Sequence, residues 1–207
     1  MHIITQHKQV NDFISDLAKK LTRSKAKFII SPSTFVQADG LRCNGYFDES
    51  PPVLAIAIGK PQKQWLPTLV HESCHFDQWK EGIPLWKEVA KYDSLKRNYH
   101  NWIDGTELSK TEVTKVVNVS RDLELDCERR TLIKIKKLGL PIDVVAYTKS
   151  AAAYVLFYNY IKMSRKWYKI GKEPYNNPEI LKLMPDNLDG DFTKLSKKLV
   201  SLFEQCV

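Results

Sequence analysis

One short stretch restricts the possible folds of this chain more than any other: residues 69–79, which contain the pattern HExxH. On a helix, His71 and His75 lie one turn apart on the same face. Two imidazoles placed in this way can bind one tetrahedral metal ion at about 2.0–2.1 Å each. Glu72 is rotated by about a quarter turn from them, within reach of a metal-bound water. The stretch therefore predicts a helix with two metal ligands and a general base.

A pair of ordinary helix histidines is the alternative, and a third ligand on another helix would distinguish the two interpretations. The sequence predicts such a helix downstream. Ser109 and Glu112 match the capping-box pattern that begins a helix, and Gly139 followed by Pro141 ends one. Residues 110–138 are therefore expected to form one continuous helix.

Two acidic residues of this long helix are expected on its apolar side. At 100° per residue, Glu124 lies in the middle of the apolar stripe and Glu128 lies at its edge. A carboxylate that points into a core is unfavourable unless it is protonated, paired or bound to metal. We therefore predict Glu124 as the third ligand and Glu128 as the acceptor of a hydrogen bond from a ligand histidine. A buried ion pair with Arg121 is the alternative. The stripe consists of Val113, Val116, Val117, Leu123, Cys127, Ile135 and Leu138.

The strings HESCH and, downstream, ELDCER resemble the gluzincins, the thermolysin-like metallopeptidases. The resemblance implies that His71, His75 and Glu124 bind one zinc ion and that Glu128 orients a histidine. Several gluzincin families have Asp where this chain has Glu128. The motif resemblance covers residues 69–79 and 121–130 only. The whole chain also resembles uncharacterised HExxH proteins encoded by bacteriophages, which have no established substrate.

The function expected on these grounds is zinc-dependent hydrolysis of peptide bonds. Glu72 would take a proton from the attacking water and deliver it to the leaving amine. A side-chain donor would share the stabilisation of the oxyanion with the metal. The sequence leaves four candidates open for this donor: Tyr99, His100, Tyr154 and Tyr158.

The formal charge of +8 makes nucleic acid a partner to consider. The lysines are spread over the chain, however, and no zinc-finger or RNA-binding signature is present, so a peptide or protein partner is expected instead. A metalloprotease that acts on DNA-bound protein is one alternative, although proteases of the SprT type usually have His as the third ligand. A second alternative is a relationship to cytoplasmic HExxH proteases that cleave a repressor. A non-catalytic zinc-binding module is the third class, but a structural site has no need of Glu72.

The order of patterns predicts an α+β fold, and with the resemblance a zincin-like one: a small sheet packed on the HExxH helix and on the long glutamate-bearing helix, followed by a helical C-terminal part. We expect one domain over residues 1–207, with the sheet and metal helix in about 1–82 and the helical part in about 109–207. The third strand, which ends at Gly59, is expected as an exposed sheet edge to which an extended substrate adds along residues 55–59. Further elements are expected as a helix over 6–22, strands over 27–30, 41–47 and 53–58, a metal helix from about Pro67 to Gly82, and helices over about 143–165, 178–183 and 191–205.

The four cysteines, Cys43, Cys74, Cys127 and Cys206, are widely spaced and form no CxxC pair. The sequence begins without a signal-peptide pattern, and its most apolar stretch, residues 151–158, is too short to span a bilayer. We therefore expect reduced thiols in a cytoplasmic protein (host cytoplasm if viral) with no membrane partner. Cys74 and Cys127 are expected to pack beside the site, because the predicted ligand set is complete without them.

Overall fold

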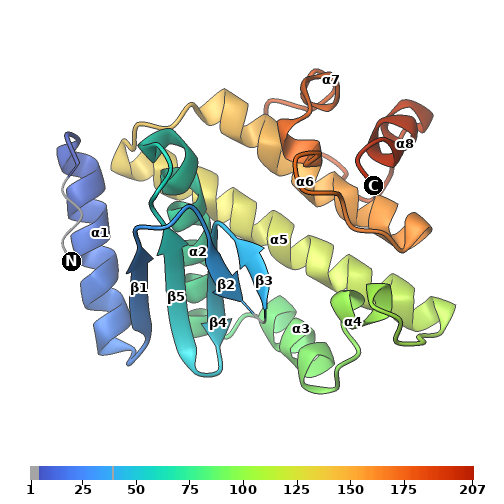
Figure 1. Cartoon of the computed structure of the whole chain (residues 1–207), viewed down its shortest axis with the longest axis horizontal. Helices are drawn as coiled ribbons and strands as arrows, with labels where there is room; N and C mark the ends of the chain where they lie inside the picture. The colour runs from blue at the N-terminus through green and yellow to red at the C-terminus, as the bar shows by residue number, and fades with distance from the viewer. Residues whose placement is uncertain (1–4, 39) are drawn as a thin grey trace. The chain divides into compact units, whose positions relative to one another are not determined.

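The computed structural model describes residues 5–38 and 40–207. The chain forms two compact units: unit 1 contains Met1–Glu81 and Arg130–Val144, and unit 2 contains Gly82–Arg129 and Val145–Val207. The long helix α5 (Lys110–Leu138) contributes residues to both units (Figure 1). A small mixed sheet accompanied mostly by helices confirms the predicted α+β class.

Unit 1 is built on a three-stranded sheet with the order β1-β5-β4. β1 pairs with β5 in parallel, and β4 pairs with β5 antiparallel. A separate antiparallel pair, β2 with β3, packs Val36 against Ala55 and Ala57 of the sheet. The strands are β1 (Lys27–Ser31), β2 (Val36–Ala38), β3 (Leu41–Cys43), β4 (Gly45–Glu49) and β5 (Pro52–Ala57).

The prediction that the third strand forms an exposed edge of the sheet is wrong. β5 is the central strand and is paired on both sides, so residues 55–57 have no free edge to offer a peptide. The chain beyond β5 is also held, since the Ile58 and Gly59 amides donate to the Ser31 and Ser33 carbonyls at 2.8 and 2.9 Å. A Cβ on Gly59 would lie 2.5 Å from the Pro32 carbonyl oxygen, so this close approach requires glycine. The apolar run of β5 reflects burial on both faces of the sheet, because the last four residues of the strand are all buried.

The strand predicted over residues 41–47 is divided in two. Asn44 separates β3 from β4, and the Asn44 carbonyl accepts from the Ala57 amide at 2.9 Å. β2 is not predicted by the sequence, because three residues are too few to show an alternating pattern.

Two helices of unit 1 flank the strands in sequence: α1 (Lys8–Arg23) and α2 (Gln62–Glu81). α2 begins five residues before the predicted start at Pro67, which therefore lies inside the helix. Proline removes one hydrogen bond there, but burial of Trp65 and Leu66 in the core favours the extra turn. The predicted end is confirmed, since Gly82 follows with a φ of +59°.

Unit 2 contains the N-terminal part of α5 and most of the remaining helices. The capping box is confirmed: the Ser109 amide donates to Glu112 at 2.9 Å, and the Glu112 amide donates to the Ser109 hydroxyl at 3.3 Å. Two helices lie between α2 and α5 along the chain. The other elements are α3 (Pro84–Ser94), α4 (Tyr99–Ile103), α6 (Val144–Ser164), a short 3-10 helix η1 (Pro174–Asn176), α7 (Pro178–Leu181) and α8 (Lys197–Glu204).

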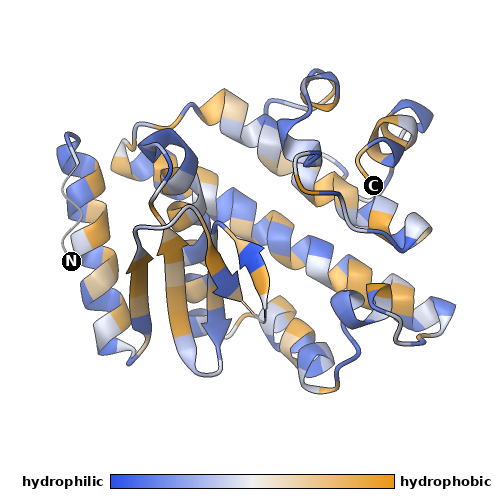
Figure 2. Cartoon of the chain, viewed as in Figure 1, coloured by the Kyte–Doolittle hydropathy of each residue, from blue (hydrophilic) through white to orange (hydrophobic). Residues whose placement is uncertain are grey.

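The hydropathy of the residues matches their burial in these strands and helices. Figure 2 shows β1 and β5 largely in orange, as expected for strands covered by other elements. On α5 the predicted apolar stripe is buried except for Leu138, which is 38% exposed because it lies in the last turn. Among the described residues, each helix is either too short or too polar to cross a lipid bilayer.

Candidate metal centre

The two histidines of the HExxH pattern lie together on α2. Their ring centroids are 4.7 Å apart, and the ring planes are nearly perpendicular at 87°. Both histidines are half-buried, whereas Glu72 between them in the sequence is buried. Leu69 and Phe76 lie on the opposite side of the helix and are fully buried. The packing of α2 on its apolar side therefore directs both imidazoles away from the core of unit 1.

A network of charged groups fixes the rotation of α2. Lys134 of α5 donates to the Ser73 hydroxyl at 2.8 Å and pairs with Asp77 at 2.9 Å, and Lys20 of α1 also pairs with Asp77. Burial alone would lower the pKa of Lys134, but Cys74 and Asp77 raise it above its ordinary value. The lysine therefore stays charged beside α2, where it helps to hold the HExxH turn in place.

His75 has a hydrogen-bonding partner that the sequence pattern does not predict. The Nδ1 atom of His75 lies 2.8 Å from the Oε1 atom of Gln78, one turn further along α2. Gln78 is fully buried, which is uncommon for glutamine. The spacing of three residues could have suggested this contact, since residues i and i+3 of a helix are neighbours.

Cys43 of β3 is a second residue near the site that sequence reasoning did not connect with it. Burial, together with the carboxyl of Glu72, raises the pKa of the Cys43 thiol to about 11. The sulfur lies 3.8 Å from the Val36 carbonyl of the neighbouring strand. A protonated, half-buried thiol therefore lies within electrostatic range of the predicted general base.

In unit 2, the predicted acidic residues of α5 differ in burial. Glu128 is buried at 5% exposure and accepts a hydrogen bond from the Tyr147 hydroxyl of α6, whereas Glu124 is half-buried. Arg121, the partner considered in the ion-pair alternative, donates to Asp122 at 2.7 Å. The guanidinium of Arg121 is therefore already engaged within its own turn of α5.

The four candidates for the oxyanion donor gather around Glu124. The Tyr158 hydroxyl lies 3.2 Å from the hydroxyls of both Tyr99 and Tyr154. Burial raises the pKa of all three phenols, and Glu124 adds to each shift. Burial lowers the pKa of His100, whereas Asp104 and Glu124 oppose this shift. Unit 2 therefore holds protonated phenols and an imidazole within electrostatic range of the predicted ligand.

One group of side chains in the described part of the chain has the arrangement of a metal site. His71, His75 and Cys127 each offer a ligand atom, and these atoms all lie within 4.8 Å of one another. Cys127 lies only three residues before the segment of α5 that belongs to unit 1. Two imidazoles and a thiolate form a donor set that zinc accepts in a tetrahedral site. The residues present therefore fit a zinc ion, and Glu124 lies about one turn before Cys127 on α5.

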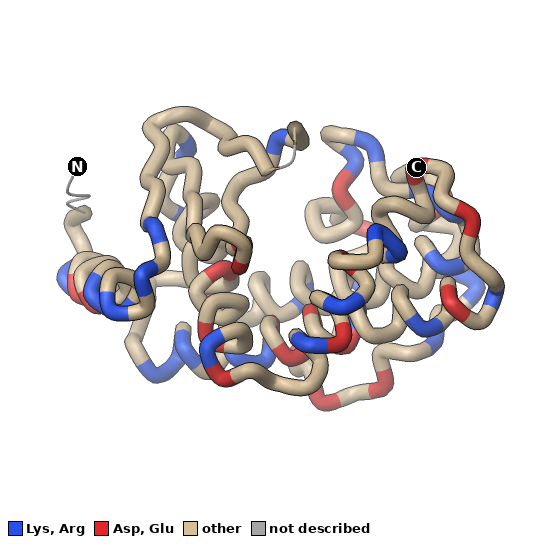
Figure 3. The backbone as a smooth tube through the Cα atoms, turned by 90° about the horizontal axis from the view of Figure 1, so that it is seen from below, with Lys and Arg blue, Asp and Glu red and all other residues tan. Residues whose placement is uncertain are grey.

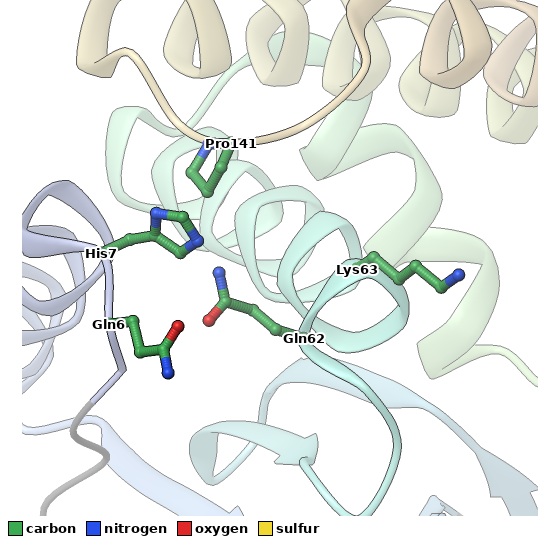
Figure 4. A pocket seen from close by; sticks show the side chains of 5 residues that line it. All are labelled: Gln6, His7, Gln62, Lys63 and Pro141. Carbon is green, nitrogen blue, oxygen red and sulfur yellow. The ribbon is translucent and has the colours of Figure 1, made fainter.

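Two hollows in unit 1 contain none of the predicted site residues. One, of about 320 Å³, is lined by Gln6, His7, Gln62, Lys63 and Pro141. Figure 4 shows His7, Gln6 and Gln62 facing one another, while Lys63 points away. The other, of about 440 Å³, lies on the sheet face over Ala55. His7 is thus a histidine of unit 1 outside the HExxH pair and can serve as a control residue.

Basic residues are distributed over many elements of both units, as Figure 3 shows by the blue segments along the tube. This distribution agrees with the absence of a compact basic block in the sequence. Comparisons with protein-family models, curated proteins and solved structures give no match for this chain. We therefore infer the function from the geometry of the site itself.

Proposed function

We propose that this protein is a zinc-dependent metallopeptidase with a zincin-like fold and a gluzincin-like ligand set. The observation that carries the proposal is the pair of imidazoles on α2, 4.7 Å apart, with the buried Glu72 between them in the sequence. A helix with two adjacent imidazoles and a carboxylate one residue after the first is an arrangement that supports metal-assisted hydrolysis.

In this proposal, His71 and His75 would hold a zinc ion, and that ion when bound would supply an activated water and polarise the scissile carbonyl. Glu72 accepts a proton from the attacking water and passes it to the leaving amine. Burial favours proton uptake by a carboxylate, because the charged form is disfavoured in an apolar environment. The low exposure of Glu72 therefore suits a group that gains a proton during the reaction.

The third ligand comes from α5 in this proposal. Glu124 is the residue expected from the sequence and from the gluzincin resemblance, and Cys127 is the residue that the cluster of donor atoms includes. With Glu124 as the third ligand, the site has the two histidines and one glutamate of thermolysin-like enzymes. With Cys127 instead, it has the combination of cysteine and histidine ligands found in other zinc sites. Removal of each side chain in turn distinguishes the two.

A phenol near Glu124 is the proposed donor to the oxyanion. Tyr99, Tyr154 and Tyr158 all keep their protons at neutral pH, since the ordinary pKa of a phenol, about 10, is already well above 7. Burial raises the pKa of each of them further. A protonated phenol can donate a hydrogen bond to developing negative charge without giving up its proton. Peptide bonds are the proposed substrate class, because general-base attack by water followed by proton delivery to an amine is the chemistry of amide hydrolysis.

The test is the variant Glu72→Gln, assayed against a peptide library together with its metal content. We expect about one zinc ion per chain in both proteins, because Glu72 is not a ligand. Hydrolysis should fall by about 10²–10⁴-fold, which is the usual contribution of a general base. Full activity of Glu72→Gln would contradict the mechanism. Zinc binding without hydrolysis by the unaltered protein would instead favour the non-catalytic zinc-binding module.

A further inference from the structure

A buried amide beside His75 has no part in the proposed reaction and needs a separate explanation. Gln78 is fully buried on α2, on the same stripe of the helix as His71 and His75. An apolar side chain of similar length would fill the same volume without the unfavourable burial of a polar group. One feature that distinguishes Gln78 from such a side chain is the contact of its Oε1 atom with the Nδ1 atom of His75 at 2.8 Å.

The chemistry of the two atoms decides the direction of this hydrogen bond. An amide oxygen can only accept, so the Nδ1 atom of His75 must carry the proton. A neutral imidazole has one protonated nitrogen, and its other nitrogen holds the lone pair. Nε2 of His75 is therefore the atom left to bind a metal ion, and the ring cannot rotate without breaking the contact.

We propose that Gln78 is a positioning residue that fixes His75 as the Nδ1–H tautomer and presents its Nε2 atom as a ligand. The partner of a ligand histidine orients the ring and raises its basicity, and loss of such a partner weakens metal binding by about 10–100-fold. The consequence for zinc affinity depends on the proposed function, but the assignment of the tautomer does not.

The Ser73–Asp77–Lys134 network supports this role by holding the opposite side of the same helical turns. Lys134 donates to the Ser73 hydroxyl at 2.8 Å and to the Asp77 carboxylate at 2.9 Å, and both contacts hold the helical turns that directly precede Gln78. A buried amide on a fixed helix has few alternative positions for its oxygen. Rigid support of this kind is what a ligand with a single tautomer requires.

The experiment compares the full-length protein with Gln78→Met, Gln78→Glu and Gln64→Met. Methionine keeps the length of the side chain but has no strong acceptor. Glutamate restores an acceptor, and exposed Gln64 lies on the same helix as a matched control. Nitrogen-15 spectra of the histidine rings, recorded near pH 8 with and without zinc, report the protonation of each ring nitrogen, and a zinc titration gives the affinity.

We expect the Nδ1–H tautomer for His75 in the unaltered protein, in Gln78→Glu and in Gln64→Met, and a mixture of tautomers in metal-free Gln78→Met. Zinc should bind about 10–100-fold more weakly to Gln78→Met than to Gln64→Met. An Nε2–H tautomer in the unaltered metal-free protein, or an unchanged tautomer and affinity in Gln78→Met, would overturn the proposal. If His75 shows the expected tautomer but the protein binds no zinc, the positioning role stands and the proposed function fails.

Discussion

Two side chains, Tyr158 and Gln78, make contacts in the structure that the sequence alone does not predict. Tyr158 was only one of four candidate donors in the sequence, whereas in the structure its hydroxyl lies 3.2 Å from those of Tyr99 and Tyr154. No local sequence pattern predicts this cluster, because Tyr99 is far from the α6 tyrosines in the sequence. Gln78 was missed for a different reason, because its contact lies within one turn of helix but carries no recognised motif.

The replacement of Tyr158 by phenylalanine tests the energetic importance of this cluster. The variant removes the shared partner of two hydroxyls in a buried environment, and the unfolding free energy should fall by about 1–3 kcal/mol. Urea denaturation measures this change. Tyr160→Phe is the matched control, since Tyr160 lies on the same helix and its hydroxyl makes no hydrogen bond to any other described residue. Equal stability of Tyr158→Phe and Tyr160→Phe would show that the hydroxyl cluster contributes nothing.

At the scale of elements, the sequence predicted helices better than strands. The capping box at Ser109 and the glycine stop at Gly139 place both ends of α5 correctly, because each signal acts on its own backbone neighbours. The start of α2 was predicted too late, because the packing of Trp65 and Leu66 outweighs the effect of Pro67. The central place of β5 depends on pairing with distant β1, which no local pattern encodes.

The capping box also makes a prediction about pH. Hydrogen bonds from Ser109, and then from Arg97, lower the pKa of Glu112 to about 2. A carboxyl whose pKa is lower in the folded than in the unfolded state stabilises the fold above its unfolded pKa, about 4.3. This stabilisation is lost as the pH falls through about 2. The difference in unfolding free energy between the protein and Glu112→Gln should therefore be constant above pH 5 and shrink below about pH 4. Denaturation curves across this range measure it, and a difference of the same size at pH 2 and pH 6 would refute the assignment.

At the scale of the whole molecule, the α+β class and the two histidines on one helix face could be predicted from the sequence. The burial of Glu128 followed from the helical stripe, but its partner Tyr147 lies on another helix and could not be predicted. Cys127 was expected only to pack, whereas its sulfur belongs to the group of possible ligand atoms. The sequence pattern predicts the helix face on which a residue lies. It does not predict whether Glu124 or Cys127, which lie on the same face of α5, supplies the third ligand.

The metal content of purified protein tests the central claim most directly. Elemental analysis should find about one zinc ion per chain. The ion should be lost in His71→Ala and in His75→Ala, and retained in His7→Ala, whose histidine lines a separate hollow. Glu124→Ala and Cys127→Ser then identify the third ligand, since only the variant that removes it should lose the ion. Zinc retained in His71→Ala and His75→Ala at the level found in His7→Ala would contradict the metal centre and, with it, the proposed hydrolase.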